Sequence, residues 1–244
     1  MKFGIAPLLL LLALTLSGCA ADSMLAVGAG VLQATTLDEN SVRQTSALAA
    51  REMDSKNQVA PVGNPYSRRL ENLTRNLTNH DGMNLNFKAY LTKDINAFAM
   101  ADGTVRVYSG LMDVMPDDQV LAVIAHEIGH VKLKHSYNQM RAQILTDSAF
   151  QGLVSAGGVI GDLSASLLGK LGQTAINAHF SQQDELEADA YAVKALKRWG
   201  RDPYAMRRSI ATLESIQSAK GGFLSSHPSN KARLENIDRE IKRM

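Results

Sequence analysis

The stretch VLAVIAHEIGH (residues 120–130) constrains this chain most, because it places two histidines four residues apart with a glutamate directly after the first. On a helix, at about 100° per residue, His126 and His130 lie about 40° apart, so both imidazoles can reach a single ion. Glu127 is offset by one step and can take a proton from a metal-bound water without being a ligand. Gly129 lets another backbone approach closely. A chance match has a probability of about 0.5% in a chain of this composition, which favours a zinc site.

A zinc hydrolase site with two histidines needs a third protein ligand and an open fourth position. The stretch DELEADAYAV (184–193) puts Glu185 and Asp189 four residues apart on a second predicted helix. We predict that Glu185 binds the metal and that Asp189 holds His126 through the other nitrogen of its ring. Glu187 lies about 200° around the helix from Glu185 and is predicted to face away. The alternative is a solvated acidic helix start, which the interleaved apolar residues disfavour.

The remaining histidines show no comparable spacing. His135 is nine residues after His126, about half a turn around the same predicted helix, so we do not expect it to be a ligand. His80 and His179 stand alone and are expected to be structural.

The N-terminal region is expected to lie outside the folded domain. Residues 1–18 combine a short positive start with an apolar run too short to span a membrane, as in a secretory signal peptide. LSGC (16–19) resembles the lipobox of bacterial lipoproteins, in which cleavage precedes the cysteine and the thiol takes a diacylglycerol. Cys19 is the only cysteine, so no intramolecular disulfide can form.

The lipobox also predicts where the protein resides. Ala20 follows Cys19 in place of an aspartate, which by the bacterial sorting pattern indicates the outer membrane. Two or more acyl chains, such as palmitate, would hold the protein firmly on the membrane without spanning it. Residues 19–36 are then a lipidated tether, and residues 37–244 form a single domain. The alternative is a plain signal peptide with an incidental cysteine.

The periodicity of the chain predicts an α+β fold that is mainly helical. Helices are expected from a Thr36/Glu39 capping box to about residue 56, from Pro65 towards Asp81, from 115–119 past His130, from Ser181 to about Trp199, over about 203–219, and at the end of the chain. Strands are expected at 85–91, 96–100 and 104–110, the last two joined as a hairpin by Asp102-Gly103. Residues 148–172 are expected to form helical segments with a flexible joint over the site, because charges interrupt their apolar run.

Four motifs, in this order along the chain, resemble the zinc metallopeptidases related to HtpX and the CAAX prenyl proteases. They are the hairpin NAFAM…GTVRVYSGLM, the H-E-x-G-H helix, the E-x-E-A-D helix and SSHPSNKAR. The resemblance covers roughly residues 37–240. It implies a gluzincin-type fold, with the active-site helix under a small antiparallel sheet or hairpin, and one Zn²⁺ per chain.

The resemblance also assigns two residues near the end of the chain. His227 is implied to lie near the metal, either to steady the oxyanion of the reaction or to occupy the open zinc position in a resting state. Arg233 either braces that loop or binds substrate, and a capped turn before the last helix is the structural alternative.

These features predict a zinc-dependent endopeptidase on the periplasmic face of the outer membrane. An exposed hairpin edge near 104–109 would pair with an extended substrate backbone as an added strand. Such pairing recognises the backbone of a substrate more than its side chains, which suits quality control of unfolded or misassembled envelope proteins. Other envelope proteases or assembly factors are expected partners, whereas a net charge of +2 gives no basis for binding nucleic acid.

Two other functions fit the same motifs. One is a chaperone-like or metal-blocked binding lipoprotein in envelope assembly, in which the metal is structural or is capped by His227. The other is a zinc hydrolase that acts on peptidoglycan peptides or another small amide. The binding protein shares the metal ligands with the enzymes, but only the enzymes need Glu127.

Overall fold

The computed structural model describes residues 37–148, 150, 163–216 and 222–244. Residues from Leu37 to Met244 form a compact unit. The predicted signal peptide, Cys19 and the tether lie outside the described residues, as do residues 149 and 151–162 of the Gly/Ala/Ser/Leu-rich stretch 148–172.

The unit is mainly helical and contains a three-stranded sheet with the strand order β1-β3-β2. Its strands are β1 (Asn86–Tyr90), β2 (Ala97–Ala99) and β3 (Thr104–Tyr108). The predicted hairpin is confirmed, because β2 pairs antiparallel with β3 across the Asp102-Gly103 turn. Gly103 has a φ of 93°, and a Cβ there would collide with the carbonyl oxygen of Asn84.

The pairing of β1 with β3 corrects two predictions. The two strands are parallel, with Phe87 opposite Val105, so the sheet is mixed and not antiparallel throughout. Because β3 is the central strand, the edge predicted near 104–109 does not exist, and all five residues of β3 are buried. The edge strand of the hairpin is β2.

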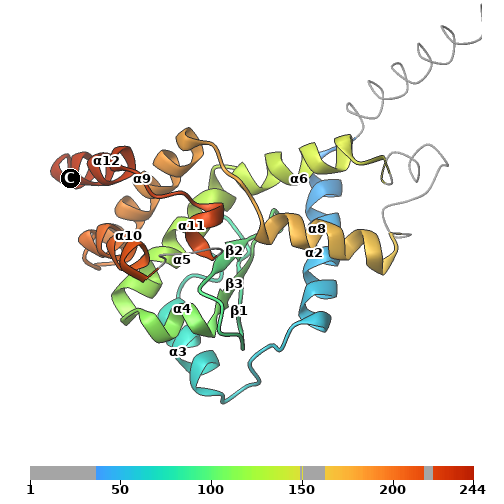
Figure 1. The fold of residues 1–244 in the computed structure, drawn as a ribbon, viewed down its shortest axis with the longest axis horizontal. Helices are drawn as coiled ribbons and strands as arrows, with labels where there is room; N and C mark the ends of the chain where they lie inside the picture. Colours follow the sequence, from blue (N-terminus) through green and yellow to red (C-terminus); the bar gives the residue numbers. More distant parts are fainter. Residues whose placement is uncertain (1–36, 149, 151–162, 217–221) are drawn as a thin grey trace, which may run out of the picture. The chain divides into compact units, whose positions relative to one another are not determined.

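Helices cover both faces of the sheet (Figure 1). Side chains of β3 alternate in direction, so Val105 and Val107 join one hydrophobic cluster while Tyr108 joins another. The first cluster includes residues of α3 (Pro65–Thr74), α5 (Asp117–Lys132), α9 (Gln182–Arg198) and α10 (Tyr204–Ile216). The second includes residues of α2 (Glu39–Lys56), α6 (His135–Thr146) and α8 (Ala165–Ile176).

Helix α5 lies in the core, against the sheet and α9. It begins after Pro116 with Asp117 and Asp118 in its first turn. Negative side chains at this position stabilise a helix by interacting with the positive end of its dipole. Every residue from Gln119 to Val131 is buried. The prediction for Gly129 is confirmed, since a Cβ there would lie 3.1 Å from the carbonyl oxygen of Ala188 in α9. The missing side chain therefore lets the two helices pack closely.

Helix α9 is positioned by the residues at its start. Ser181 and Asp184 form a capping box, in which each side chain hydrogen-bonds to the backbone N–H of the other residue. The helix ends at Arg198, close to the predicted boundary. Glu185 and Asp189 are both buried and share the face that packs on α5.

The other helix boundaries agree with the sequence in part. Asn64 caps α3 as predicted, but the N-cap of α2 is Asp38 and not Thr36. Residues 109–114, expected to continue the strand in part, form the short helix α4 (Ser109–Val114). A short helix α11 (Phe223–Ser226) precedes the last helix, α12 (Lys231–Lys242). Among the described residues, no helix is both long and apolar enough to cross a bilayer.

Candidate metal centre and active site

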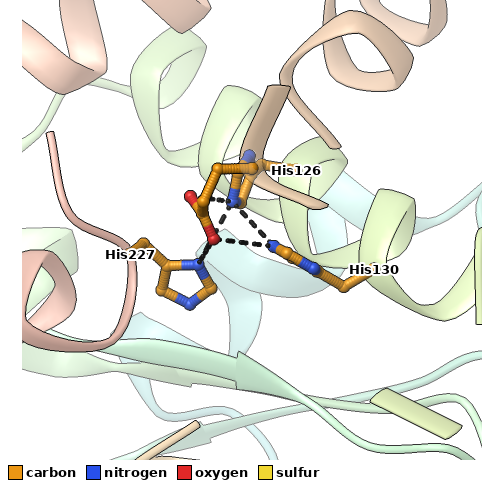
Figure 2. Close-up of side chains that lie close together, drawn as sticks. His126, His130 and His227 are labelled. Carbon is orange, nitrogen blue, oxygen red and sulfur yellow. Dashed lines mark hydrogen bonds and ion pairs between the residues drawn. The ribbon is translucent and has the colours of Figure 1, made fainter. Parts of the chain in front are cut away.

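Four side chains from three parts of the fold converge in the core. His126 and His130 come from α5, Glu185 from α9, and His227 from the residue after α11. One ligand atom of each lies within 4.8 Å of the others, and all four residues are buried. Figure 2 shows the three imidazoles arranged around one carboxylate. This cluster brings together residues that the sequence separates by as many as 101 positions.

The spacing of these atoms suits one metal ion. The Nε2 atoms of His126 and His130 are 3.0 Å apart, and the Glu185 oxygens lie 3.5 and 3.4 Å from them, respectively. Two ligands bound to tetrahedral zinc at 2.0–2.1 Å stand about 3.3 Å from each other. Imidazole nitrogens and a carboxylate are also the donors that zinc prefers. Converging lone pairs of this kind need a cation or a proton between them, so the residues fit a zinc site.

Asp189 lies against His126 on the side away from the cluster. Its Oδ1 is 2.9 Å from Nδ1 of His126, and Arg233 donates to both of its oxygens at 2.7 Å. Although burial raises the pKa of Asp189, Arg233 and His126 hold it below the usual value. The ionised carboxylate therefore accepts the Nδ1 proton of His126 and leaves Nε2 free to face the cluster.

Arg233 is wholly buried and braces the last loop from inside. Besides Asp189, its guanidinium donates to the backbone carbonyls of His227 and Pro228 and pairs with Glu185 at 2.6 Å. Of the alternatives predicted for this residue, the bracing one agrees with these contacts.

Glu127 stands beside the cluster without joining it. Its Oε1 lies 3.4 Å from Nε2 of His227 and accepts no hydrogen bond from the part of the chain that the structure describes. Burial raises the pKa of Glu127 above its usual value, and the nearby His227 and His126 only partly offset this effect. The result is a buried carboxylate with raised basicity next to a candidate metal site.

The two histidines of α5 differ in their electrostatics. Burial alone would lower the pKa of His126, but Glu185 and Asp189 outweigh it and raise the pKa to about 9. For His130, burial dominates and lowers the pKa well below its usual value. The pKa of Glu185 is raised by burial but held well below its usual range by His227 and His126. The two carboxylates thus favour the protonated form of His126, whereas burial favours the neutral form of His130.

His227 occupies the fourth corner of the cluster. Its Nδ1 is 2.9 Å from Oε1 of Glu185 and 3.3 Å from Nε2 of His126. The ring stacks on Phe223, which is also wholly buried, with centroids 4.3 Å apart. Its Nδ1 thus supplies the fourth potential ligand atom of the cluster.

Two neighbours of His130 are not evident from the sequence. His135 does not lie half a turn further along the same helix, because α5 ends at Lys132 and a new helix begins at His135. Its Nδ1 is 3.1 Å from Nδ1 of His130. Phe180 stacks on the His130 ring with centroids 3.8 Å apart. No glycine or proline marks the helix break, and an isolated phenylalanine carries no positional signal.

The other predicted residues fall outside the cluster. Glu187 faces away from it, with 44% of its side chain exposed, and contacts His135. His80 packs edge-on against Trp199, and His179 is exposed. Cys19 lies outside the described residues.

Known proteases are similar in sequence to this chain. The chain is 40% identical to Metalloprotease LoiP of Escherichia coli (strain K12) over 230 residues, which cover 92% of this chain and 91% of that protein. It is 37% identical over 230 residues to Metalloprotease YcaL of the same organism, covering 91% of each. The beta-barrel assembly-enhancing protease of that organism is 30% identical over 166 residues, or 62% of this chain and 33% of that protein.

A family model agrees with these similarities and with the geometry of the cluster. The model of peptidase family M48 matches residues 67–241, a range that includes the sheet, α5, α9 and His227. Within that range lies the buried group of two histidines and a glutamate that fits a single metal ion. The chain therefore belongs to peptidase family M48 and is a zinc metalloprotease.

Proposed function

We propose that this metalloprotease is an endopeptidase that cleaves unfolded or misassembled envelope proteins while anchored to the periplasmic face of the outer membrane. The observation that carries the enzymatic part is the convergence of His126, His130 and Glu185 beside the buried carboxylate of Glu127. In this proposal the first three residues hold the zinc. The anchor is a lipid on Cys19.

Glu127 is the proposed general base. When bound, zinc polarises a carbonyl oxygen and lowers the pKa of a coordinated water. Glu127 would take the proton of the attacking water and deliver it to the leaving amine. Its raised pKa supports this role, because a more basic carboxylate accepts the proton more readily. Asp189 and Arg233 would hold His126 in the orientation that the reaction needs.

Strand β2 is the proposed site for the substrate backbone. The Met100 N–H donates to Thr104 and the Asn96 carbonyl accepts from Tyr108, so the intervening Ala97 and Ala99 direct their backbone groups towards the other edge. The N–H of Ala97 donates there to the side chain of Asn96, a bond that a pairing peptide would replace. An extended peptide pairing there would run past Glu127, whose carboxylate accepts a hydrogen bond from the backbone N–H of Ala99. Because β2 is wholly buried and α8 packs against it, α8 must shift before a substrate can bind.

A second candidate function is a binding lipoprotein with a blocked metal. The position of His227 favours it, since Nδ1 of this residue lies within the ligand cluster and takes the place of a water or substrate. An enzyme would have to move His227 out of this place or use it to stabilise the oxyanion. A blocked binding protein would keep it there.

The name of one relative supports a role in the cell envelope. The beta-barrel assembly-enhancing protease matches 62% of this chain, and its name describes a protease that acts in the assembly of β-barrel proteins. Misassembled chains present extended backbone, which is what pairing at β2 would recognise. Other proteases or assembly factors of the envelope are the partners that such a role implies.

Proteolysis of an unfolded protein tests the proposal. Purified, zinc-loaded protein is incubated with an unfolded model protein and, as a matched control, with the same protein in its folded state. We expect cleavage of the unfolded substrate alone, loss of cleavage with a zinc chelator, and recovery when zinc is restored. No cleavage of several unfolded substrates would instead support the binding lipoprotein.

Membrane fractionation tests the anchor. Replacing Cys19 with serine removes the thiol that takes the lipid, so the variant should leave the outer-membrane fraction and appear in the soluble periplasmic fraction. Ser17→Ala keeps the cysteine and is expected to fractionate as the wild type does. If Cys19→Ser still sediments with the outer membrane, the lipid anchor is wrong.

A further inference from the structure

His135 makes a contact that the proposed chemistry has not used. Its side chain is almost wholly buried, and its Nδ1 lies 3.1 Å from Nδ1 of His130, on the opposite side of that ring from the metal cluster. Its other nitrogen, Nε2, lies 3.3 Å from Glu187 and 3.4 Å from Asp184. The residue thus stands between a proposed ligand and two carboxylates of α9.

The backbone is shaped to make this contact. On a continuous helix, His135 would lie about 140° around the axis from His130 and could not touch its ring. Instead, the chain turns at Lys134, which has a left-handed conformation with φ 64° and ψ 19°. Non-glycine residues adopt this conformation rarely. The turn starts α6 and brings the His135 ring back to His130.

The protonation of the two rings follows from the geometry. If Nε2 of His130 binds a metal, its lone pair is used there and Nδ1 must carry the proton. A hydrogen bond between the two Nδ1 atoms then requires an unprotonated Nδ1 on His135. The proton of neutral His135 is therefore on Nε2, where Glu187 and Asp184 can accept it.

We propose that His135 is a positioning residue, which accepts the Nδ1 proton of His130 and links that ligand to the carboxylates of α9. The inference rests on the proposed metal site. It makes α9 the support of both histidines, since Asp189 holds His126 directly while Glu187 and Asp184 hold His130 through His135. Phe180 stacks on the His130 ring and further restricts its rotation.

Zinc affinity of a pair of variants matched in size tests this role. In His135→Asn, the side-chain amide places an oxygen where Nδ1 of histidine lies, whereas His135→Leu has the same shape but accepts no hydrogen bond. Loss of such a contact to a metal ligand typically weakens metal binding by about 10–100-fold. We expect that weakening in the leucine variant, measured by competition with a chromophoric chelator, and near wild-type affinity in the asparagine variant. His179→Leu, at an exposed histidine, is the control.

A measurement on the unaltered protein tests the same inference without relying on variants that must fold. In the zinc-loaded wild type, nitrogen-15 NMR of the imidazoles should show His135 with its proton on Nε2 and His130 with its proton on Nδ1. A proton on Nδ1 of His135 would overturn the inference, as would equal zinc affinity of the leucine and asparagine variants. A protein that binds zinc as expected yet cleaves nothing would contradict the proposed function alone.

Discussion

At the scale of single residues, four side chains lie close enough together to bind one metal ion, but only three of them are proposed ligands. Replacing His126, His130 or Glu185 with alanine should lower the zinc content well below one per chain after dialysis, because each is a proposed ligand in a site with three protein ligands. His227→Ala should keep about one zinc per chain. Elemental analysis of the purified variants measures this, with His179→Ala as a control at an exposed histidine.

The Glu185 variant discriminates between two sets of ligands. Nδ1 of His227 already lies 3.3 Å from Nε2 of His126, so it could replace a missing carboxylate. Full zinc content in Glu185→Ala, together with loss of zinc in His227→Ala, would show that His227 is the third ligand. Glu187 is less suited than His227 to replace Glu185 as a ligand, because it points away from the cluster towards His135.

At the scale of secondary-structure elements, the close packing of α5 on α9 assembles the site. A Cβ on Gly129 would lie 3.1 Å from the oxygen and 3.2 Å from Cα of Ala188, so a larger side chain must push the helices apart. Gly129→Val should destabilise the fold by roughly 1–3 kcal/mol through overpacking. It should also weaken zinc binding, because Glu185 on α9 would move away from the histidines on α5. In Gly129→Ala, a gain in helix propensity of about 1 kcal/mol offsets part of the cost.

Urea unfolding and zinc titration measure both effects of the Gly129 variants. Gly169 in α8 provides a control, because a Cβ there meets only the flexible end of Lys56. Gly169→Val should therefore leave zinc affinity unchanged. Wild-type zinc affinity in Gly129→Val would mean that the helices tolerate separation, and the packing argument would be wrong.

The attachment of α2 to the sheet predicts a pH dependence of stability. Asp54 of α2 accepts hydrogen bonds from Arg106, Lys88 and Tyr90 of the sheet. Burial raises the pKa of Asp54, but these bonds outweigh it and hold the pKa below the usual value. A lowered pKa in the folded state means that this stability is present above about pH 4, the unfolded pKa, and is lost as the pH falls through the folded pKa.

Asp54→Asn should accordingly lower the free energy of unfolding at pH 7 by about 1.5–3 kcal/mol, the contribution of hydrogen bonds to a charged group. The difference from the wild type should shrink as the pH falls below 4. Urea unfolding of both proteins across this range measures it. Asp118→Asn breaks an exposed ion pair with Arg208 and should cost less than about 1 kcal/mol. A difference that does not change with pH would contradict the argument.

The elements show how far the sequence determines the site. The helices that carry His126, His130, Glu185 and Asp189 were predictable, because capping residues and helical periodicity are local properties. The helix break at Lys134 was not predictable, since a left-handed lysine with no neighbouring glycine depends on tertiary packing. The contact between His130 and His135 depends on that break and could not be inferred from spacing.

At the scale of the whole molecule, the sheet topology is the main result that the sequence did not predict. A hairpin is a local structure, whereas the parallel pairing of β1 with β3 joins strands that are not consecutive. That pairing makes β3 central and leaves β2 as the edge beside α5. It thereby moves the proposed substrate strand from residues 104–109 to residues 97–99.

The central claim is that the buried cluster of three histidines and a glutamate is a catalytic zinc site, and Glu127→Gln tests it most directly. Glutamine preserves the size of the side chain but cannot accept the proton of the attacking water. The variant should therefore fold and keep its zinc. Loss of a general base typically lowers the rate about 10²–10⁴-fold, which would abolish visible cleavage of an unfolded protein.

The decisive measurement compares zinc content and proteolysis in the wild type and in Glu127→Gln, in parallel samples. The account predicts about one zinc per chain in both proteins and cleavage by the wild type alone. Equal, chelator-sensitive cleavage by both proteins would contradict it and remove Glu127 from the mechanism.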